Sequence, residues 1–250
     1  MFKKMLFYTL LFTTFSYSFI SLDPPVIGEK KGLDGEAALG ATYSAGNSDY
    51  SSIGLALKGQ YSENEWLMYL IAAYHYGESN GDKNTNDGLI HLRYVHTIAD
   101  TLYDYEFFLQ SEFNEFQDIK KRNLAGANIR RKLNLTFDKF YVGLGLFYSY
   151  LEPETITIID PIYRQTKVNS YISFSHDINE HFTVTYLGFY QTTIDDFSDL
   201  RVFQILQLDT ALTENLTLGF DIKHEYNKTP YNKIEKNDIR STINLKYELK

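Results

Sequence analysis

Cysteine is absent from the 250 residues of this chain. Disulfides, thiolate metal sites and thiol catalysis are therefore excluded, and so is a lipidated cysteine at a mature N-terminus. Positive charge is also in short supply, since 24 Lys and Arg against 32 Asp and Glu give a net charge of -8. Because phosphate binding needs a basic face, we expect no nucleic-acid partner.

Long apolar runs are missing beyond the N-terminus. After Ser18 no segment reaches the roughly 18 consecutive apolar residues that a membrane helix needs. The first residues have the pattern of a secretory signal, in which Lys3 and Lys4 precede the apolar run 5–15. That run is too short to span about 30 Å of hydrocarbon comfortably. We predict a signal peptide over residues 1–18, with cleavage leaving Phe19 as the new N-terminus.

Aromatic residues are abundant. They make up 16% of the chain, with 21 Tyr and 18 Phe, and Tyr favours β-strands and boundaries between apolar and wet surroundings. From residue 35 to residue 249, apolar and polar side chains alternate with period two, and clusters of Gly, Asn, Asp and Ser interrupt the alternation. This pattern is typical of strands and hairpins, and it predicts about twelve strands.

The predicted connections alternate between two kinds. Tight turns are expected around Asn64, Asp100, Asp138, Glu180 and Asn215, and longer polar loops over 45–49, 77–87, 117–122, 152–165, 195–199 and 228–238. Outer-membrane barrels alternate in this way, with the short turns in the periplasm. We therefore predict an all-β fold, a transmembrane up-and-down antiparallel β-barrel over residues 35–250, after a short periplasmic segment at 19–34. An even strand number places both termini in the periplasm.

Aromatic side chains gather near both ends of the predicted strands. Trp66 and Phe140 lie close to the short turns, whereas Tyr74 and Tyr148 lie close to the loops, as expected for girdles between hydrocarbon and headgroups. A soluble Tyr-rich β-sandwich explains neither the leader nor the two kinds of connection. The expected location is the outer membrane of a Gram-negative bacterium. Expected partners are outer-membrane lipid, lipopolysaccharide and, during insertion, the barrel assembly machinery.

The opening of the predicted barrel resembles a known family. Residues 39–49, Leu-Gly-Ala-Thr-Tyr-Ser-Ala-Gly-Asn-Ser-Asp, form an alternating strand that runs into a Gly-Asn turn. This stretch is similar to the first hairpin of the domain-of-unknown-function family 481, often labelled salt-induced outer-membrane proteins. The resemblance implies an outer-membrane barrel over nearly all of the mature chain and supplies no catalytic residue. The chain departs from usual barrels by ending on Lys250 rather than on an aromatic residue.

Function is expected on the face that points into the barrel. By strand parity this face carries candidate lumen-lining residues of both signs: Glu36, Lys58, His91, Arg93, Glu106, Glu112, Arg130, Asp221, Lys223, Glu225, Arg240 and Lys246. Such residues can line a narrow pore for small solutes or ions, or pair with one another and close it. In the last hairpin we expect charges to meet across the strands: Asp221, Lys223 and Glu225 against Arg240, Asn244 and Lys246.

An outer-membrane hydrolase of lipase or protease type is the competing class. It needs a nucleophile and a base within hydrogen-bond reach, held by a third group. His75 and His91 are expected on one face near each other, whereas Ser175 and His176 face opposite ways. No third partner is evident, so we predict no catalytic residue. The six His lack metal-ligand spacing, and we expect neither a metal nor a cofactor. A closed structural or adhesive barrel is the third possibility.

Overall fold

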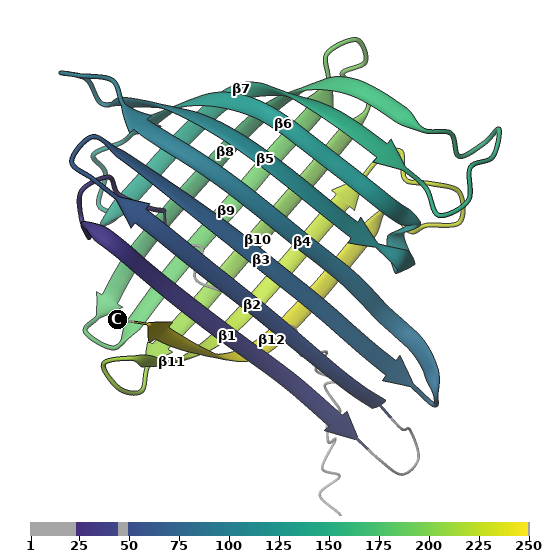
Figure 1. The fold of residues 1–250 in the computed structure, drawn as a ribbon, viewed down its shortest axis with the longest axis horizontal. Coiled ribbons are helices and arrows are strands. Elements are labelled where there is room, and N and C mark those ends of the chain that lie inside the picture. Colours follow the sequence, from purple (N-terminus) through teal and green to yellow (C-terminus); the bar gives the residue numbers. More distant parts are fainter. Residues whose placement is uncertain (1–23, 45–49, 250) are drawn as a thin grey trace, which may run out of the picture.

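A computed structural model describes residues 24–44 and 50–249. Within these residues the chain forms twelve antiparallel strands that close into one barrel (Figure 1). The predicted fold class is confirmed. The predicted signal peptide at 1–18, its cleavage site and the Gly-Asn turn within 45–49 lie outside the described residues.

Each strand pairs with its neighbours in sequence, and β1 pairs with β12 to close the sheet. The strands are β1 (Gly32–Ser44), β2 (Tyr50–Ser62), β3 (Trp66–Ser79), β4 (Asp82–Thr97), β5 (Tyr103–Asn114), β6 (Ile119–Lys132), β7 (Lys139–Glu152), β8 (Tyr163–Asn179), β9 (Phe182–Thr193), β10 (Leu200–Ala211), β11 (Leu216–Asn227) and β12 (Asn237–Leu249). A short 3-10 helix, η1 (Glu115–Gln117), precedes β6. The barrel begins at Gly32, earlier than the predicted start at Gly35.

No helix in the part of the chain that the structure describes is long and apolar enough to cross a membrane.

The exterior of the barrel is apolar and the interior is polar. On β2, Leu55 and Leu57 point outward and are exposed, whereas Ser52 and Ala56 point inward and are buried. The same alternation places a belt of exposed apolar side chains around the barrel: Leu39, Ile53, Leu70, Ile90, Leu109, Leu144, Ile172, Leu218 and Ile243. Soluble monomers rarely expose apolar patches this extensive. A closed sheet leaves no unpaired strand edge. Together with an apolar belt on its outside, this is the structure of a membrane-spanning barrel.

Aromatic girdles accompany the belt. On the outside of β2 to β4, near the short turns, neighbouring rings of Tyr61, Trp66 and Tyr94 lie 5.6 and 5.8 Å apart. On the outside of β7 and β8, Phe140 and Phe174 stack at 5.9 Å. Rings at these positions are suited to the boundary between hydrocarbon and headgroups.

Two of the predicted loops are wrong. Residues 77–87 are mostly strand, because β3 and β4 continue to a tight turn at Asn80 and Gly81, which both have positive φ. Residues 117–122 are also mostly strand, since β6 begins at Ile119. Polar composition suggested loops there. Paired backbone groups hold these polar segments as hairpins instead.

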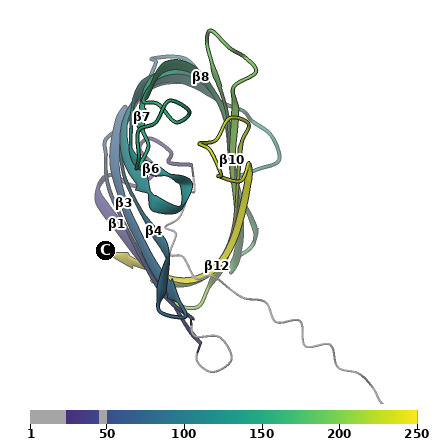
Figure 2. The ribbon, with the colours of Figure 1, turned by 90° about the vertical axis from the view of Figure 1, so that its right-hand side faces the viewer.

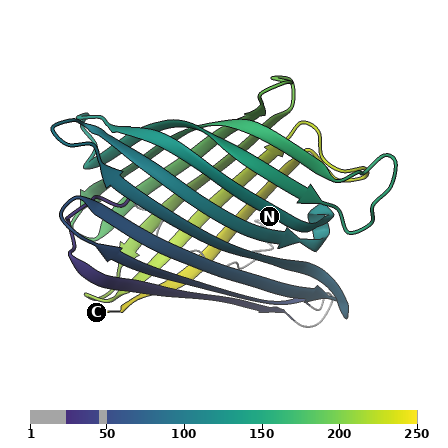
Figure 3. The ribbon, with the colours of Figure 1, turned by 45° about the horizontal axis from the view of Figure 1, so that its top comes forward.

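The barrel is flattened. In Figure 2 the strands form an elongated ring, with β1, β3 and β4 along one long side and β10 along the other. Figure 3 shows the steep tilt of the strands, and it places the start of β1 and the end of β12 at the end with the short turns. We call this end the turn end and the opposite one the loop end. Flattening brings opposite walls close enough for long side chains to meet.

Candidate functional site

All the predicted lumen residues lie on inward-facing positions of the strands, as parity requires. They occupy different depths. Glu36, Lys58 and Lys246 lie toward the turn end. The middle holds His91, Arg93, Glu106 and Arg130, and farther toward the loops lie Glu112, Lys223 and Glu225. Asp221 contacts Asn244 on the adjacent strand β12, and Arg240 contacts Asp87 on β4.

Glu106 is the centre of the middle level, with 1% of its surface exposed. Its Oε2 accepts hydrogen bonds from Asn128 Nδ2 at 3.1 Å and from the Tyr171 hydroxyl at 2.9 Å. The guanidinium groups of Arg93 and Arg130 flank the carboxylate, with closest nitrogen–oxygen distances of 3.6 and 3.8 Å. Tyr171 comes from β8 and Glu106 from β5, so this contact joins strands that are not neighbours.

Glycine makes room for the Tyr171 contact. A Cβ atom on Gly143 would lie 2.0 Å from Cε1 of Tyr171, so the ring occupies the place a side chain would need. Gly145, two residues further along β7, is covered in the same way by Asn128 and the backbone of Ala127. The two glycines allow the aromatic ring and the amide to lie flat against the wall of the lumen.

A layer of five charged side chains crosses the lumen toward the loop end, and we call it the charge layer: Glu112, Arg122, Arg201, Lys223 and Glu225. Arg122 Nη1 contacts Glu112 Oε1 at 2.7 Å, and Lys223 Nζ contacts Glu225 Oε1 at 2.5 Å. Arg201 Nη2 lies 3.0 Å from Glu225 Oε2 and 4.0 Å from Glu112 Oε1. Since β5 and β10 are far apart in the ring of strands, Arg201 links opposite walls.

Arg122 and Arg201 were not among the predicted lumen residues. Arg122 was placed in a predicted loop, and Arg201 follows another predicted loop directly. Both belong to strands, β6 and β10. If the alternation of inward and outward side chains is continued from the rest of each strand to these positions, both residues are identified as inward-facing.

The charge pairs expected within the last hairpin are replaced by other pairs, although Asp221 does contact Asn244 across the hairpin, at 2.5 Å. The register sets Lys223 opposite Arg240, a like charge, and Asp221 opposite Thr242. Lys246 and Arg240 reach past the adjacent strand instead. Lys246 pairs with Asp209 on β10 at 2.7 Å, and Arg240 pairs with Asp87 on β4 at 3.2 Å and with Asp238 on its own strand at 3.0 Å.

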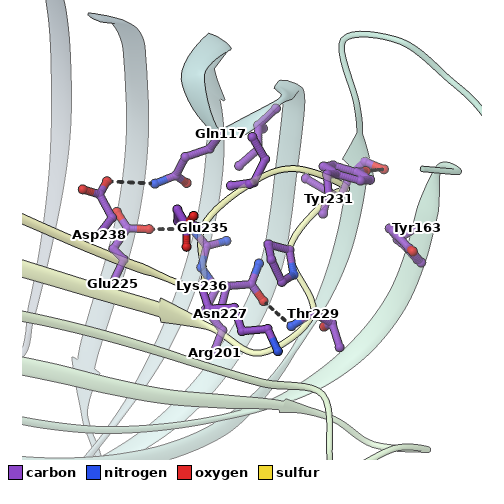
Figure 4. Close-up of a pocket in the computed structure, with 14 residues that line it drawn as sticks. Gln117, Tyr163, Arg201, Glu225, Asn227, Thr229, Tyr231, Glu235, Lys236 and Asp238 are labelled. Carbon is purple, nitrogen blue, oxygen red and sulfur yellow. Dashed lines mark hydrogen bonds and ion pairs between the residues drawn. The ribbon is translucent and has the colours of Figure 1, made fainter. Parts of the chain in front are cut away.

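Three spaces follow one another along the lumen. A vestibule of about 400 Å³ lies at the turn end, a middle chamber of about 270 Å³ follows, and an upper cavity of about 40 Å³ lies under the loops (Figure 4). Pro25 and Lys58 line both the vestibule and the middle chamber. Arg201 and Glu225, members of the charge layer, line both the middle chamber and the upper cavity.

These spaces differ in charge. Among the described residues that line the vestibule are nine carboxylates and four lysines. Six Lys and Arg side chains and four carboxylates line the middle chamber, together with aromatic rings such as Phe108 and Phe203. An acidic opening concentrates cations, and a basic excess further in opposes their passage. The lumen is therefore electrostatically asymmetric from end to end.

The connection between β11 and β12, residues 228–236, covers the loop end. The buried Tyr231 donates its hydroxyl to the carbonyls of Leu151 and Pro161, both at 3.3 Å, and burial raises the pKa of this hydroxyl. Figure 4 shows Tyr231 above the upper cavity, on the same loop as Thr229 and Lys236. The loop therefore closes over the upper cavity.

Asp199 anchors this cover. Its carboxylate accepts hydrogen bonds from Lys167 at 2.7 Å and from the hydroxyls of Thr193 and Thr229. Burial alone would raise the pKa of Asp199, but these three donors outweigh it and hold the pKa below its usual range. Because Thr229 belongs to the covering loop, the charged form of Asp199 ties that loop to β8 and β9.

The histidines do not assemble a hydrolytic site around His91. Its Nδ1 pairs with Gln110 Oε1 at 2.9 Å, and its Nε2 accepts a hydrogen bond from Arg93 at 3.3 Å, so both ring nitrogens are engaged by groups that are not nucleophiles. His75 pairs with Asp87 at 2.7 Å. Among the described residues, no group of three or more His, Cys, Asp or Glu is arranged to hold a metal ion.

Several solved structures are similar to the chain at low sequence identity. The NanC porin is 13% identical, with a TM-score of 0.46, and the match covers 87% of this chain and 98% of that one. The KdgM porin is 10% identical, with a TM-score of 0.45, over 87% of this chain and 99% of that one. The translocator domain of the autotransporter NalP from Neisseria meningitidis is 10% identical, with a TM-score of 0.46, over 89% and 90%. No curated protein matches the chain.

One protein-family model matches nearly the whole barrel. It covers residues 37–249, from within β1 to the last residue of β12, and it therefore includes the strands that carry the charge layer and Glu106. The match agrees with the resemblance of the first hairpin. The chain belongs to the family described as Protein of unknown function, DUF481.

Proposed function

We propose that this protein is an outer-membrane barrel of a Gram-negative bacterium that passes small solutes or ions through its lumen and catalyses no reaction. The observation that carries the proposal is the row of polar, charged spaces that extends from the vestibule to the upper cavity. Inward charges alone also fit a closed barrel, and it is the unfilled volume of the three spaces that favours passage. The apolar belt supports the membrane location.

The proposed orientation has the turn end in the periplasm and the loop end outside. In outer-membrane barrels the short connections face the periplasm, and the start of β1 and the end of β12 lie at that end here. The acidic vestibule would then face the periplasm. The covering loop 228–236 would face the medium, in contact with lipopolysaccharide.

The passage is narrow. The charge layer joins opposite walls and Glu106 contacts a strand that is not its neighbour, so the solute must be small enough to pass between side chains that move by rotamer changes. The same contacts favour a second candidate, a closed structural barrel. The two differ in one property, since only the channel lets solute through.

Liposome swelling separates these candidates. Purified protein is reconstituted and challenged with salts and with uncharged solutes of increasing size. We expect slow swelling with potassium chloride and with the smallest solutes, and none with a trisaccharide. A correctly folded preparation that swells in no solute contradicts the channel and favours the closed barrel.

A separate assay addresses hydrolysis. Lipase and protease substrates are offered to the parent protein and to His91→Ala, which removes one of the two histidines that line the middle chamber. We expect no turnover by either protein. Activity in the parent that His91→Ala abolishes, in a folded barrel, would show that the protein is an enzyme.

A further inference from the structure

The residues directly before β1 lie inside the barrel. Pro24 is buried, and Pro24 and Pro25 both line the middle chamber. Pro25 and Val26 line the vestibule on the other side. Residues 24–29, which we call the N-terminal segment, therefore lie between the two larger spaces of the lumen. They belong to no strand, and β1 starts only at Gly32.

Four kinds of contact hold the N-terminal segment. Arg130 Nη2 donates to the carbonyl of Pro25 at 3.1 Å, and the Gly28 amide donates to Ser62 Oγ at 3.2 Å. Ile27 packs against the inward cluster of Leu67, Tyr69 and Val95. Lys139 Nζ contacts Glu29 Oε2 at 3.0 Å. These partners come from β2, β3, β4, β6 and β7, so the segment bridges much of one wall.

Gly28 allows the chain to bend where it leaves the lumen. Its φ is +77°, a conformation that L side chains rarely adopt, and it lies beside the turn between β2 and β3. This bend turns the chain from the lumen into the start of β1. The segment thus combines a Pro-Pro pair at 24–25, an isoleucine at 27 that packs against apolar residues of the wall, and a glycine at 28.

The hold on the N-terminal segment is weaker than that on the strands. The strands are fixed by backbone ladders. Among the described residues, the segment contacts the strands through a hydrogen bond from the Gly28 amide to Ser62, a hydrogen bond from Arg130, the packing of Ile27 and the ion pair of Glu29. The Glu29 carboxylate in the ion pair is half exposed, and such pairs contribute little and weaken with salt. Segments outside the ladder open locally without unfolding the rest.

We propose that residues 24–29 are a releasable plug that separates the vestibule from the middle chamber. In the seated state Pro24 and Pro25 fill the lumen beside Lys58. When the segment leaves, the two spaces join and the lumen opens from the turn end up to the charge layer. The effect on permeation rests on the proposed function, whereas the effect on access to the middle chamber does not.

The first experiment measures access. Because the chain has no cysteine, Ala73→Cys places a single reactive thiol in the lining of the middle chamber. A polar, thiol-reactive reagent is added to the folded protein. The further substitution Ile27→Asp places a charge in the apolar seat of residue 27, which is formed by Leu67, Tyr69 and Val95, and should release the plug. We expect labelling to become about tenfold faster.

Val26→Asp is the matched control. It adds the same charge one residue away, where the side chain lines the vestibule and not the apolar seat. We expect labelling of Ala73→Cys to keep its parent rate in this variant. Equal labelling rates in the parent, Ile27→Asp and Val26→Asp would overturn the plug, whatever the barrel conducts. Circular dichroism and the shift of the unboiled band confirm that each variant is folded.

The second experiment measures conduction with the plug fixed or released. Ile27→Cys together with Leu67→Cys joins the segment to its seat on oxidation and frees it on reduction, and each single-cysteine variant is the control. We expect reduction to raise the conductance severalfold in the double variant alone. Equal, measurable conductance before and after reduction overturns the plug and leaves the channel standing. Faster labelling in Ile27→Asp with no conductance in any state keeps the plug and removes the proposed channel.

Discussion

Replacing Arg201 with alanine is expected to make the lumen more selective for cations. Arg201 is the side chain of the charge layer that contacts carboxylates on opposite walls, Glu225 at 3.0 Å and Glu112 at 4.0 Å. Its removal changes the layer from three cations and two carboxylates to two of each. It also removes the group that joins the walls, so the conductance should rise.

The size of the shift follows from Coulomb's law. An ion that passes about 7 Å from the guanidinium interacts with it by about 0.6 kcal/mol at an effective dielectric constant of about 80, and by about 2.4 kcal/mol at about 20. At about 0.1 M salt the screening length is about 10 Å, which favours the smaller figure. We therefore expect the ratio of potassium to chloride permeability to rise roughly threefold to tenfold.

Reversal potentials across a planar bilayer with a potassium chloride gradient measure this ratio. Arg164→Ala is the matched control, because it removes the same charge from an exposed position of β8 whose guanidinium lies over Tyr150. The control should keep the parent ratio. If Arg201→Ala and Arg164→Ala give the same reversal potential as the parent, the charge layer does not lie on the ion path.

Four further outcomes are expected. Lys246→Ala should also shift selectivity toward cations, because it leaves Asp209 unneutralised in a vestibule that already has more carboxylates than lysines; an unchanged reversal potential contradicts this. Gly143→Ala should lower stability in urea by about 1–3 kcal/mol, because its Cβ would overlap Tyr171, whereas Gly59→Ala, with open space around it, should change stability far less. Asp199→Asn should speed proteolysis of loop 228–236 at pH 7. Because folding lowers the pKa of Asp199, its stabilising effect is present above the unfolded value of about 3.9 and is lost as pH falls through the folded value, so parent and variant should converge in strong acid. Mass spectrometry of the mature protein should find Phe19 at the N-terminus, and intact Met1 in a soluble fraction would contradict the predicted signal peptide.

Much of the fold follows from local pattern. Side chains alternate strictly between the two faces of a strand, so period-two alternation identified both the strands and the inward face without any knowledge of the register. That is why Glu106, Lys223 and Lys246 were found from sequence. The loop predictions at 77–87 and 117–122 failed for a related reason, since beyond the apolar belt a strand and a loop are equally polar, and only backbone pairing distinguishes them.

The arrangement within the lumen depends on the whole barrel. Arg201 meets Glu112 only because the ring of strands is flattened, and no pairing rule for adjacent strands contains that information. The same holds for Arg240 and Asp87, which lie 153 residues apart. The packing of Ile27 against the wall is a further contact that depends on the whole barrel. From sequence, residues 24–29 were expected in a short periplasmic segment at 19–34, and their position inside the barrel is evident only from the wall residues that contact them.

Single-channel recording from the purified, folded protein in a planar bilayer tests the central claim most directly. The narrow, charge-lined lumen predicts small unitary currents that grow with salt concentration, with weak ion selectivity and a rectification that follows the acidic vestibule. Recordings that show inserted, heat-modifiable barrels and no current at any salt concentration or voltage would contradict the channel and establish a closed barrel in its place.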